Sequence, residues 1–375
     1  MRDGELAVKH VIIFGSSYDI HVSAVAWALR RAGVNVQLGE SLRHDPSARM
    51  AVRADGQGLH ASMSGCPADA VTSIWFRRPA RPDVRDQGEA DQMFSTQQWG
   101  LFQKNFLSVA KDLISGFWVN DPAAAVATES KLLQLRVAAE VGLEFPEAVV
   151  TNDARSVADL VQHWGRVVFK TFQGHVWEDQ ATQRIYNTDV AVLDASTELP
   201  ELPIAFCPGI YQRYIEKVCD LRVTVIGERF FAARISHRSG GAFVDWRPFI
   251  LDDEMLVETV QLPEVTELKL RRLMRRLGIV FGCIDLVEDA SGNLYFLEVN
   301  QQGQFLFIEK MLPELPLLHA MSTMLASGDA AYSLESNIPA APYEQYLQSV
   351  DYQQALAEMS MQELPPHTVE QASVA

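Results

Sequence analysis

Residues 281–304 read FGCIDLVEDASGNLYFLEVNQQGQ, and this stretch decides how the rest of the chain is interpreted. Two apolar runs flank the dipeptide Ser291-Gly292, a pattern typical of two antiparallel strands joined by a tight turn. If this turn sets the register, Asp285 lies opposite Glu298, and strand alternation places Asn300 on the same face as Glu298. The stretch therefore predicts two carboxylates and an amide oxygen close together, within strands that are otherwise hydrophobic.

These three oxygen-bearing side chains suit a magnesium site. Proteins usually hold Mg²⁺ through one or two carboxylates together with substrate phosphates. We therefore predict that Asp285, Glu298 and Asn300 bind Mg²⁺. The alternative is a solvated sheet edge with ordinary surface acids. Because unpaired carboxylates are seldom buried, the apolar surroundings of these acids favour the metal site.

The composition limits the class of protein and the kind of partner. The 375 residues are enough for two or three domains, and 48% of them are hydrophobic and 21% charged. No apolar run approaches the length of a membrane span. The net charge of −16 argues against a nucleic-acid partner and against an anionic membrane surface, because both carry dense negative charge. An acidic ligand would need a local basic pocket, since the overall field repels it.

The cysteines and the first residues bear on the compartment. The four cysteines show no C-x-x-C pairing, and Cys207 and Cys283 lie in apolar, strand-like runs, where we expect small core residues. The first residues lack the pattern of a signal peptide. We therefore expect reduced cysteines and a cytoplasmic location.

The texture of the sequence changes along the chain and predicts three segments and a tail. Residues 1–119 alternate strands and helices, which predicts a small α/β domain. Residues 120–205 begin with a helix start signal and predict a compact α+β lobe. Residues 206–330 carry consecutive strands, with a hairpin turn at Gly227-Glu228, and end in the metal-site hairpin. Residues 331–375 are acidic and rich in Pro and Gln, and we expect them to be partly ordered at best.

Two lysines are candidates for binding phosphates. The sequence has neither a Walker loop nor a dinucleotide-binding glycine motif, so phosphates would need another holder. Lys170 ends an apolar strand and precedes residues 171–175, a candidate phosphate-covering loop, and Lys131 lies early in the second segment. Either could be an ordinary solvated lysine. The strand at residues 211–216 could offer its backbone to an adenine edge.

Arginines form two basic spots. Arg234 and Arg247 flank a glycine-rich turn, and arginines in such a place can fork onto phosphate or carboxylate oxygens. Arg77 and Arg78 directly follow an apolar strand. Taken alone, that pair would be interpreted as solvent-exposed.

An acid and a base stand two residues apart at Asp220 and Arg222. On a strand they share one face. The ordinary interpretation is a cross-strand surface ion pair, worth about 0.5 kcal/mol.

The order of these residues resembles the ATP-grasp superfamily over roughly residues 120–310. The resemblance rests on the two lysines, followed by the acid and the glutamate-x-asparagine set. More narrowly, the chain resembles the microviridin-type graspetide synthetases, which mature ribosomally made peptides. The stretches that carry this closer resemblance are IWFRRP (74–79), DLR (220–222), DWR (245–247) and LEVNQQGQF (297–305). The sequence departs from the family at Gln301-Gln302, where Pro-Asn or similar is common.

The resemblance implies a fold, two cofactors and a substrate. The fold would be the mixed α/β (α+β) ATP-grasp fold, with an N-terminal pre-ATP-grasp α/β domain and a nucleotide bound between two α+β lobes. ATP and Mg²⁺ would activate an Asp or Glu side chain of a precursor peptide as an acyl phosphate. A Thr or Ser hydroxyl or a Lys amine would then attack it, closing an ester or amide ring. The resemblance also implies an N-terminal leader that docks on the enzyme, and a homodimer.

The candidate site residues fit this chemistry in five groups. They are Lys131 and Lys170 for the phosphates; Gln212, Arg213, Tyr214 and Glu216 for the nucleotide; Asp285, Glu298 and Asn300 for Mg²⁺; Arg234 and Arg247 for the γ-phosphate and the acyl-phosphate oxyanion; and Arg77, Arg78, Asp220 and Arg222 for the peptide. Arginine donors suit developing negative charge because they can be oriented in advance of the reaction.

Two other functions stay open at this point. A carboxylate–amine ligase acting on a small molecule or a protein terminus would share the ATP site, but it gives no reason for the IWFRRP stretch. A non-catalytic module that senses nucleotide would have no need of the metal ligands. A neighbouring gene for a peptide rich in Thr, Glu and Asp would favour the graspetide interpretation.

Overall fold

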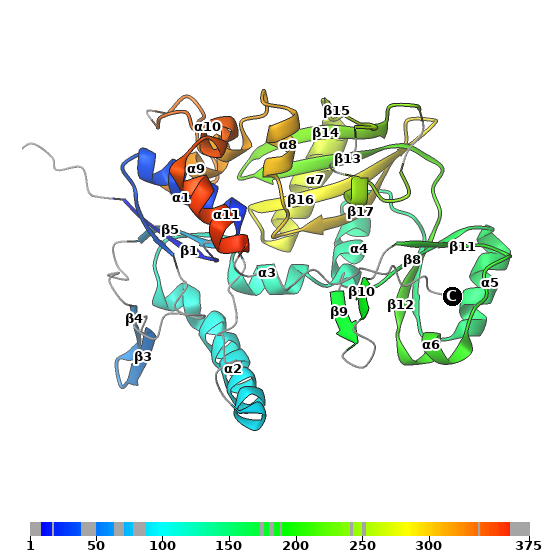
Figure 1. The fold of residues 1–375 in the computed structure, drawn as a ribbon, viewed down its shortest axis with the longest axis horizontal. Helices are drawn as coiled ribbons and strands as arrows, with labels where there is room; N and C mark the ends of the chain where they lie inside the picture. Colours follow the sequence, from blue (N-terminus) through cyan, green and yellow to red (C-terminus); the bar gives the residue numbers. More distant parts are fainter. Residues whose placement is uncertain are drawn as a thin grey trace, which may run out of the picture.

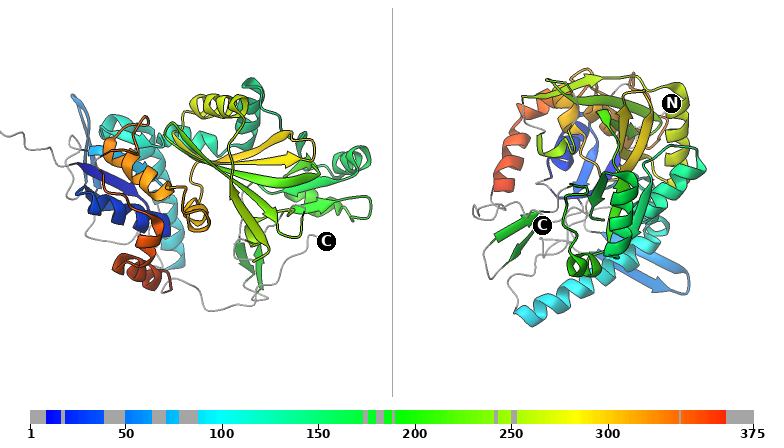
Figure 2. Two further views of the ribbon diagram at one scale, coloured as in Figure 1. Left: turned by 90° about the horizontal axis from the view of Figure 1, so that it is seen from above. Right: turned by 90° about the vertical axis from the view of Figure 1, so that its right-hand side faces the viewer.

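The computed structural model describes most of the chain, and Figure 1 shows how its parts are arranged. The described residues are 9–16, 19–38, 50–63, 71–77, 88–172, 176–179, 184–187, 190–240, 243–249, 253–336 and 338–360. An N-terminal sheet lies at one end, a large sheet in the middle and a smaller sheet at the other end, an order that Figure 2 repeats from above. None of the described helices is long and apolar enough to cross a membrane.

The N-terminal sheet is parallel, with four strands in the order β2-β1-β5-β6. Its strands are β1 (His10–Phe14), β2 (Asn35–Leu38), β5 (Val71–Phe76) and β6 (Phe117–Val119). The adjoining elements are α1 (Ile20–Arg31), α2 (Glu89–Leu113) and the hairpin of β3 (Met50–Asp55) and β4 (Gly58–Met63). Val11 and Ile13 face α1, whereas Ile12 and Phe14 face α2. Because helices cover both faces, these strands are apolar on both sides.

Two short helices lead from this sheet to the rest of the molecule. They are α3 (Pro122–Thr128) and α4 (Lys131–Glu140). Asp121 caps α3 by accepting hydrogen bonds from two backbone N–H groups of its first turn, as the start signal predicts. The Ser130 hydroxyl accepts from Leu133 N and caps α4, which makes Lys131 the first residue of that helix.

The smaller sheet is antiparallel, with four strands in the order β11-β8-β12-β7. Its elements are β7 (Ala148–Thr151), α5 (Ala154–Trp164), β8 (Val167–Lys170), β11 (Ala191–Leu193), α6 (Glu201–Phe206) and β12 (Gly209–Arg213). A separate hairpin pairs β9 (Val176–Asp179) with β10 (Arg184–Asn187). Val157 and Val161 of α5 pack on Val167 and Tyr211 of the sheet. The end of β8 places Lys170 at the edge that faces the large sheet.

The large sheet is antiparallel, with five strands in the order β15-β14-β13-β16-β17. Its elements are β13 (Lys217–Ile226), β14 (Arg229–His237), β15 (Met255–Thr259), α7 (Glu264–Leu277), β16 (Phe281–Asp289) and β17 (Leu294–Asn300). The predicted hairpin turn at Gly227-Glu228 joins β13 to β14. Helix α7 covers one face of the sheet with Leu270 and Leu273, whereas Asp220, Asp285 and Val287 on the opposite face line a cavity.

The pairing of β16 with β17 confirms the predicted register. Asp285 is the partner of Glu298, and the strands turn between Asp289 and Leu294. The register shifts directly after Asp285, which makes this point of the hairpin irregular. Two acidic side chains are therefore placed side by side by local strand pairing alone.

The C-terminal helices return to the N-terminal sheet. They are α8 (Leu306–Met311), α9 (Leu317–Ser327), α10 (Tyr343–Leu347) and α11 (Val350–Ser360). Tyr343 and Tyr346 are buried, and the Tyr346 ring lies 5.6 Å from that of Trp27 in α1. The prediction of a partly ordered tail overlooked these aromatic residues. Its last part, residues 361–375, lies outside the described residues.

The cysteine predictions are right at one position and wrong at another. Cys283 is buried in β16, as predicted. Cys207 is exposed, because it follows the short surface helix α6 instead of lying in a core strand.

Glu309 is a buried carboxylate that joins three of the C-terminal helices. It lies on α8 and accepts hydrogen bonds from Leu318 N in α9 at 2.6 Å and from Tyr343 N in α10 at 2.8 Å. Burial raises the pKa of Glu309 to about 7, against the opposing effect of these backbone donors. Protonation of this group is therefore coupled to folding.

We expect Glu309→Gln to lower the free energy of unfolding by about 1–3 kcal/mol at pH 6, because one buried backbone donor loses its acceptor. A carboxyl group with a raised pKa in the folded state contributes most stability below pH 4.5 and loses it as the pH rises through 7. The deficit of the variant should therefore narrow between pH 5 and pH 8. Urea unfolding at several pH values measures it, and a deficit that widened with pH would contradict this account.

Candidate functional site

A cavity of about 1220 Å³ lies between the smaller sheet and the large sheet. Its walls come from the ends of β8 and β12 on one side and from β13, β16 and β17 on the other, with the start of α4 beside them. The short 3-10 helix η2 (Arg247–Phe249) contributes Arg247 and Pro248. The cavity is larger than most small-molecule pockets, which measure roughly 300–1,000 Å³.

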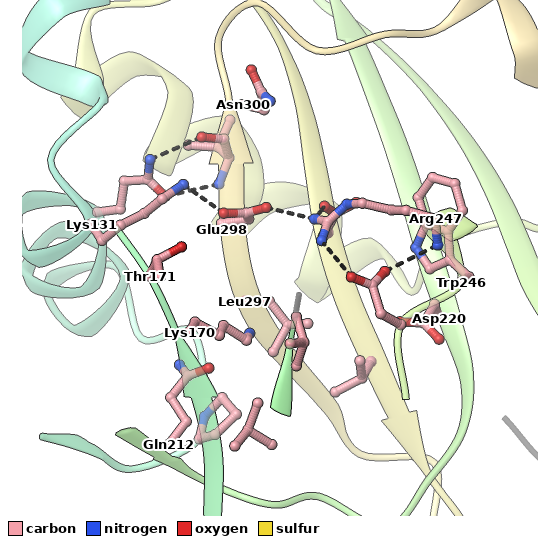
Figure 3. A pocket seen from close by; sticks show the side chains of 18 of the residues that line it. Lys131, Lys170, Thr171, Gln212, Asp220, Trp246, Arg247, Leu297, Glu298 and Asn300 are labelled. Carbon is pink, nitrogen blue, oxygen red and sulfur yellow. Dashed lines mark hydrogen bonds and ion pairs between the residues drawn. The ribbon is translucent and has the colours of Figure 1, made fainter. Parts of the chain in front are cut away.

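Many of the predicted site residues line this cavity, and Figure 3 shows several of them. Those that do are Lys131, Lys170, Gln212, Arg213, Tyr214, Asp220, Arg247, Asp285, Glu298 and Asn300. Arg78 lies outside the described residues. The roles assigned to these residues stay predictions, but the fold brings them together from seven different elements.

The two predicted metal-binding carboxylates converge on one nitrogen atom. Arg247 Nη2 donates to Asp285 Oδ2 at 3.0 Å and to Glu298 Oε1 at 2.7 Å. The second oxygen of each carboxylate also has a cation: Lys131 Nζ lies 2.5 Å from Glu298 Oε2, and Arg222 Nη1 lies 2.8 Å from Asp285 Oδ1. In Figure 3, Lys131 and Arg247 lie on either side of Glu298.

These cations keep Glu298 ionised. Burial acts to raise its pKa, but the charges of Lys131 and Arg247 outweigh burial and bring the pKa to about 2. Lys170 shows the reverse case, because burial lowers its pKa and the nearby Glu298 only partly compensates. The cavity therefore holds a permanent anion beside a lysine that loses its proton more easily than usual.

The donor set fits a magnesium ion. Asp285 and Glu298 already direct one oxygen each toward a shared positive charge, and Asn300 lines the same cavity. All three offer oxygen, the ligand atom that Mg²⁺ prefers. Within the described ranges, no group of three or more His, Cys, Asp or Glu side chains is arranged to hold a metal by itself. Such a set suits an ion that completes its coordination with phosphate oxygens.

The opposite wall of the cavity comes from the smaller sheet. Gln212 is buried on β12, and the next two residues lead into the connection to β13. Arg213 N donates to Glu147 O at 2.8 Å, and Tyr214 N donates to Arg166 O at 3.1 Å. Of the predicted covering loop, Thr171 and Phe172 line the cavity, and residues 173–175 lie outside the described residues.

Some lining residues were missed at the sequence level. Gln134 of α4 donates to Val299 O at 2.9 Å and accepts from Val299 N at 2.9 Å, so it fixes the outer edge of β17 beside Glu298. Its position three residues after Lys131, on one helix face, is the signal that could have found it. Lys217 also lines the cavity and holds Asp220 at 2.7 Å. Burial raises the pKa of Asp220 to about 6, although Lys217 acts against it.

The structure places Arg234, predicted to act on the γ-phosphate, outside the cavity lining. Arg234 pairs with Leu221 across β13 and β14, whereas the neighbouring Arg222 pairs with Asp285. Alternation therefore directs Arg234 to the sheet face covered by α7, where it forms an ion pair with Glu288 at 3.1 Å. The nearby glycine-rich turn suggested that Arg234 meets a ligand, but the alternation of side chains along β14 determines which face of the sheet Arg234 lies on.

Three predicted contacts with ligands also need correction. Arg77 is 0% exposed, and Arg222 is buried behind Asp285, so neither is among the described residues that line the cavity. Both are surrounded by protein acceptors instead of solvent. Glu216 also lies outside the cavity lining; its side chain is largely exposed and forms an ion pair with Arg166.

Comparison by sequence finds only a local match. No family model matches the chain. D-alanine–D-alanine ligases of Burkholderia vietnamiensis and Burkholderia orbicola are 39% identical to it over 66 residues, which is 16% of this chain and 21% of each ligase. The chain thus matches about a fifth of the length of these curated relatives.

Comparison of structures covers nearly the whole chain. The macrocyclase MdnC of Microcystis aeruginosa, solved with its precursor peptide MdnA, is 22% identical, with a TM-score of 0.70 over 85% of this chain and 99% of MdnC. An ATP-grasp ligase of Chryseobacterium gregarium, solved with ADP and a leader and core peptide, is 20% identical, with a TM-score of 0.72 over 88% of this chain and 100% of that chain. The chain has the ATP-grasp fold.

The ATP-grasp fold confirms the predicted fold class. The ligase PsnB, solved with Mg and ADP, adds a TM-score of 0.65 at 20% identity over 86% of this chain and 98% of PsnB. In the present chain the cavity lies between the smaller and the large sheet, which are the two lobes of the ATP-grasp fold. The domain boundaries at residues 119, 205 and 330 stay predictions.

We expect Lys170→Met to weaken the binding of a fluorescent ADP analogue by about tenfold to a hundredfold, because a charge-assisted contact is worth about 1.5–3 kcal/mol. The lowered pKa of Lys170 adds a pH dependence. Wild-type affinity should fall as the pH rises toward the range where ordinary lysines titrate, whereas Lys170→Arg should keep its affinity to higher pH. Titrations from pH 7 to pH 10 measure this, and identical pH profiles would contradict it.

Proposed function

We propose that this chain is an ATP-dependent ligase that macrocyclises a ribosomally made precursor peptide. The observation that carries the proposal is the pair of carboxylates that converge on one cation, in a cavity that also holds Lys131 and Lys170. The solved proteins of the same fold support the peptide substrate, since MdnC was solved with a precursor peptide and the Chryseobacterium ligase with ADP and leader and core peptides. The size of the cavity leaves room for more than a nucleotide.

The chemistry follows from the residues that line the cavity. A carboxylate oxygen of the peptide attacks the γ-phosphorus of ATP, and the bond to ADP breaks. A hydroxyl or amine of the same peptide then attacks the acyl carbon, and phosphate leaves with the activated oxygen. Lys131 and Lys170 would hold the phosphates as point charges, and Arg247 would stabilise the charge on the transferred phosphoryl group. Bound Mg²⁺, held by Asp285, Glu298 and Asn300, would neutralise charge on the phosphates.

The partners and the setting belong to the same proposal. The substrate would be a peptide with a leader and an acidic core containing Thr, Ser or Lys, and Asp220 would lie where that core enters. The resemblance found in the sequence supports a homodimer, and the three described cysteines, which are free, support the cytoplasm. The net charge of −16 speaks against nucleic acid and anionic membranes as partners.

A second function has one observation in its favour. The local match to D-alanine–D-alanine ligases supports an ATP-grasp carboxylate–amine ligase that acts on a small molecule or a protein terminus. Such an enzyme would use the same phosphate and metal residues. The coverage of only 66 residues makes this the weaker proposal.

The deciding experiment is a mass measurement. Purified protein is mixed with ATP, Mg²⁺ and the candidate precursor peptide encoded near its own gene. We expect the peptide to lose one water for each bond formed, and we expect no loss with Glu298→Gln. An unchanged peptide mass, together with ATP turnover in the presence of small amino acids, would favour the second function.

We expect Arg247→Ala to reduce the rate of macrocyclisation by about 10²–10³-fold, since removal of one preorganised donor to a developing oxyanion has this effect. Arg234→Ala is the matched control, because the structure moves Arg234 to the opposite face of the large sheet. It should keep the rate within about twofold. Rates from quenched reactions measure both, and equal losses in the two variants would argue against the assignment of Arg247.

A further inference from the structure

The loop that follows β17, residues 301–305, is held by buried side chains from distant parts of the chain. Asn120 Nδ2 donates to Gln301 O at 3.2 Å. Arg77 Nη1 donates to Gly303 O at 2.9 Å and also to the carbonyl of Gln302. Arg222 Nη2 donates to Gln304 O at 2.9 Å. The four successive carbonyls of this loop thus each receive a hydrogen bond from a side chain.

The far end of the 301–305 loop is held by a histidine. Phe305 N and Leu306 N donate to His21 Nε2 at 3.0 Å and 3.3 Å, so this nitrogen is an acceptor and carries no proton. The proton of the neutral ring then lies on Nδ1, 3.3 Å from Asp19 Oδ1. The other oxygen of Asp19 accepts from Arg77 Nε at 3.1 Å. Asp19 therefore orients two of the side chains that hold the loop, Arg77 and His21.

The 301–305 loop is directly connected to the candidate metal ligands. Asn300 precedes it, and Gln302 N donates to Asn300 Oδ1 at 3.0 Å. Arg222 joins the loop to Asp285, because its two Nη atoms donate to Gln304 O and to Asp285 Oδ1. The packing is tight: a Cβ at Gly303 would lie 2.5 Å from the Cys283 side chain and 3.1 Å from Arg222 Nη2.

We propose that Arg77 is a positioning residue for the magnesium site. Oriented by Asp19, it fixes the 301–305 loop, and the loop in turn fixes Asn300 and, through Arg222, Asp285. Only a guanidinium presents the planar fork that meets Asp19 and two carbonyls at once, and the Arg77 side chain is 0% exposed. The inference rests on the proposed function, in which Asp285, Glu298 and Asn300 hold Mg²⁺.

The test measures the affinity of the full-length protein, saturated with ADP, for Mn²⁺. Electron paramagnetic resonance reports the concentration of free Mn²⁺ during the titration. We expect Arg77→Met to weaken Mn²⁺ binding by about tenfold to a hundredfold, the usual effect of losing a group that orients metal ligands. The affinity for an ADP analogue in EDTA should stay within about twofold, because Lys131 and Lys170 line the cavity and Arg77 does not. Arg77→Lys should not restore Mn²⁺ binding, since an ammonium group lacks the fork.

Two further variants separate positioning from general destabilisation. Ser73→Ala is the matched control, because Ser73 lies on β5, the strand that Arg77 directly follows, is fully buried and donates to Leu325 O in α9, away from the loop. It should lower the melting temperature and leave Mn²⁺ affinity unchanged. Asp19→Asn keeps the cap of α1, since Asn caps as well as Asp, but it removes the charge that orients Arg77 and His21. It should weaken Mn²⁺ binding even if Arg77→Met fails to fold.

The outcomes distinguish this inference from the function on which it rests. Weaker Mn²⁺ binding in Arg77→Met and Asp19→Asn, but not in Ser73→Ala, supports it. Unchanged Mn²⁺ affinity in either folded variant, or an equal loss in Ser73→Ala, overturns it. If Glu298→Gln bound Mn²⁺ as tightly as the wild-type protein does, the metal site and this inference would both be overturned. A peptide that is not cyclised by a protein with normal Mn²⁺ binding would overturn the proposed function alone.

Discussion

Two carboxylates held side by side in a partly buried cavity repel each other and lose hydration, so they require cations as partners. Asp285 and Glu298 are in this position because they are paired residues on adjacent strands of one hairpin. Their cations arrive from three other elements: Lys131 from the first turn of α4, Arg222 from β13 and Arg247 from η2. Much of the remaining structure around the cavity is arranged to deliver these three charges to one place.

The cations differ in how deeply they are buried. Arg222 is enclosed by protein and has a second acceptor in the 301–305 loop, so it is part of the framework. Arg247 lies at the cavity surface on a short 3-10 helix, and its side chain is 47% exposed. In this chain it occupies the point where both carboxylates meet.

The site is not confined to the two ATP-grasp lobes. The chain leaves β17, passes through the loop gripped by Arg77 and His21, and continues into α8 and α9, which pack against the N-terminal sheet. The N-terminal sheet therefore supports the hairpin of β16 and β17, which carries the proposed metal ligands. Glu309 extends this support by joining α8 to the first turns of α9 and α10.

The features that could be predicted from the sequence are those that depend on residues adjacent along the chain. The register of Asp285 with Glu298, the turn at Gly227-Glu228 and the start of α3 at Asp121 all follow from a few adjacent residues, because turn and capping geometry are local. The ATP-grasp fold and the gathering of Lys131 and Lys170 at one cavity were also anticipated, through the resemblance.

Which arginines reach the cavity depends on how distant segments of the chain pack together, so it could not be predicted from the sequence. Arg234 is turned away by strand parity relative to β13, and Arg77 is buried by partners 58 and 226 residues away in the sequence. The residue type arginine does not indicate whether the guanidinium contacts solvent, a ligand or a backbone carbonyl. Its surroundings are set by the packing of distant segments, and that packing has no signature in the residues beside it.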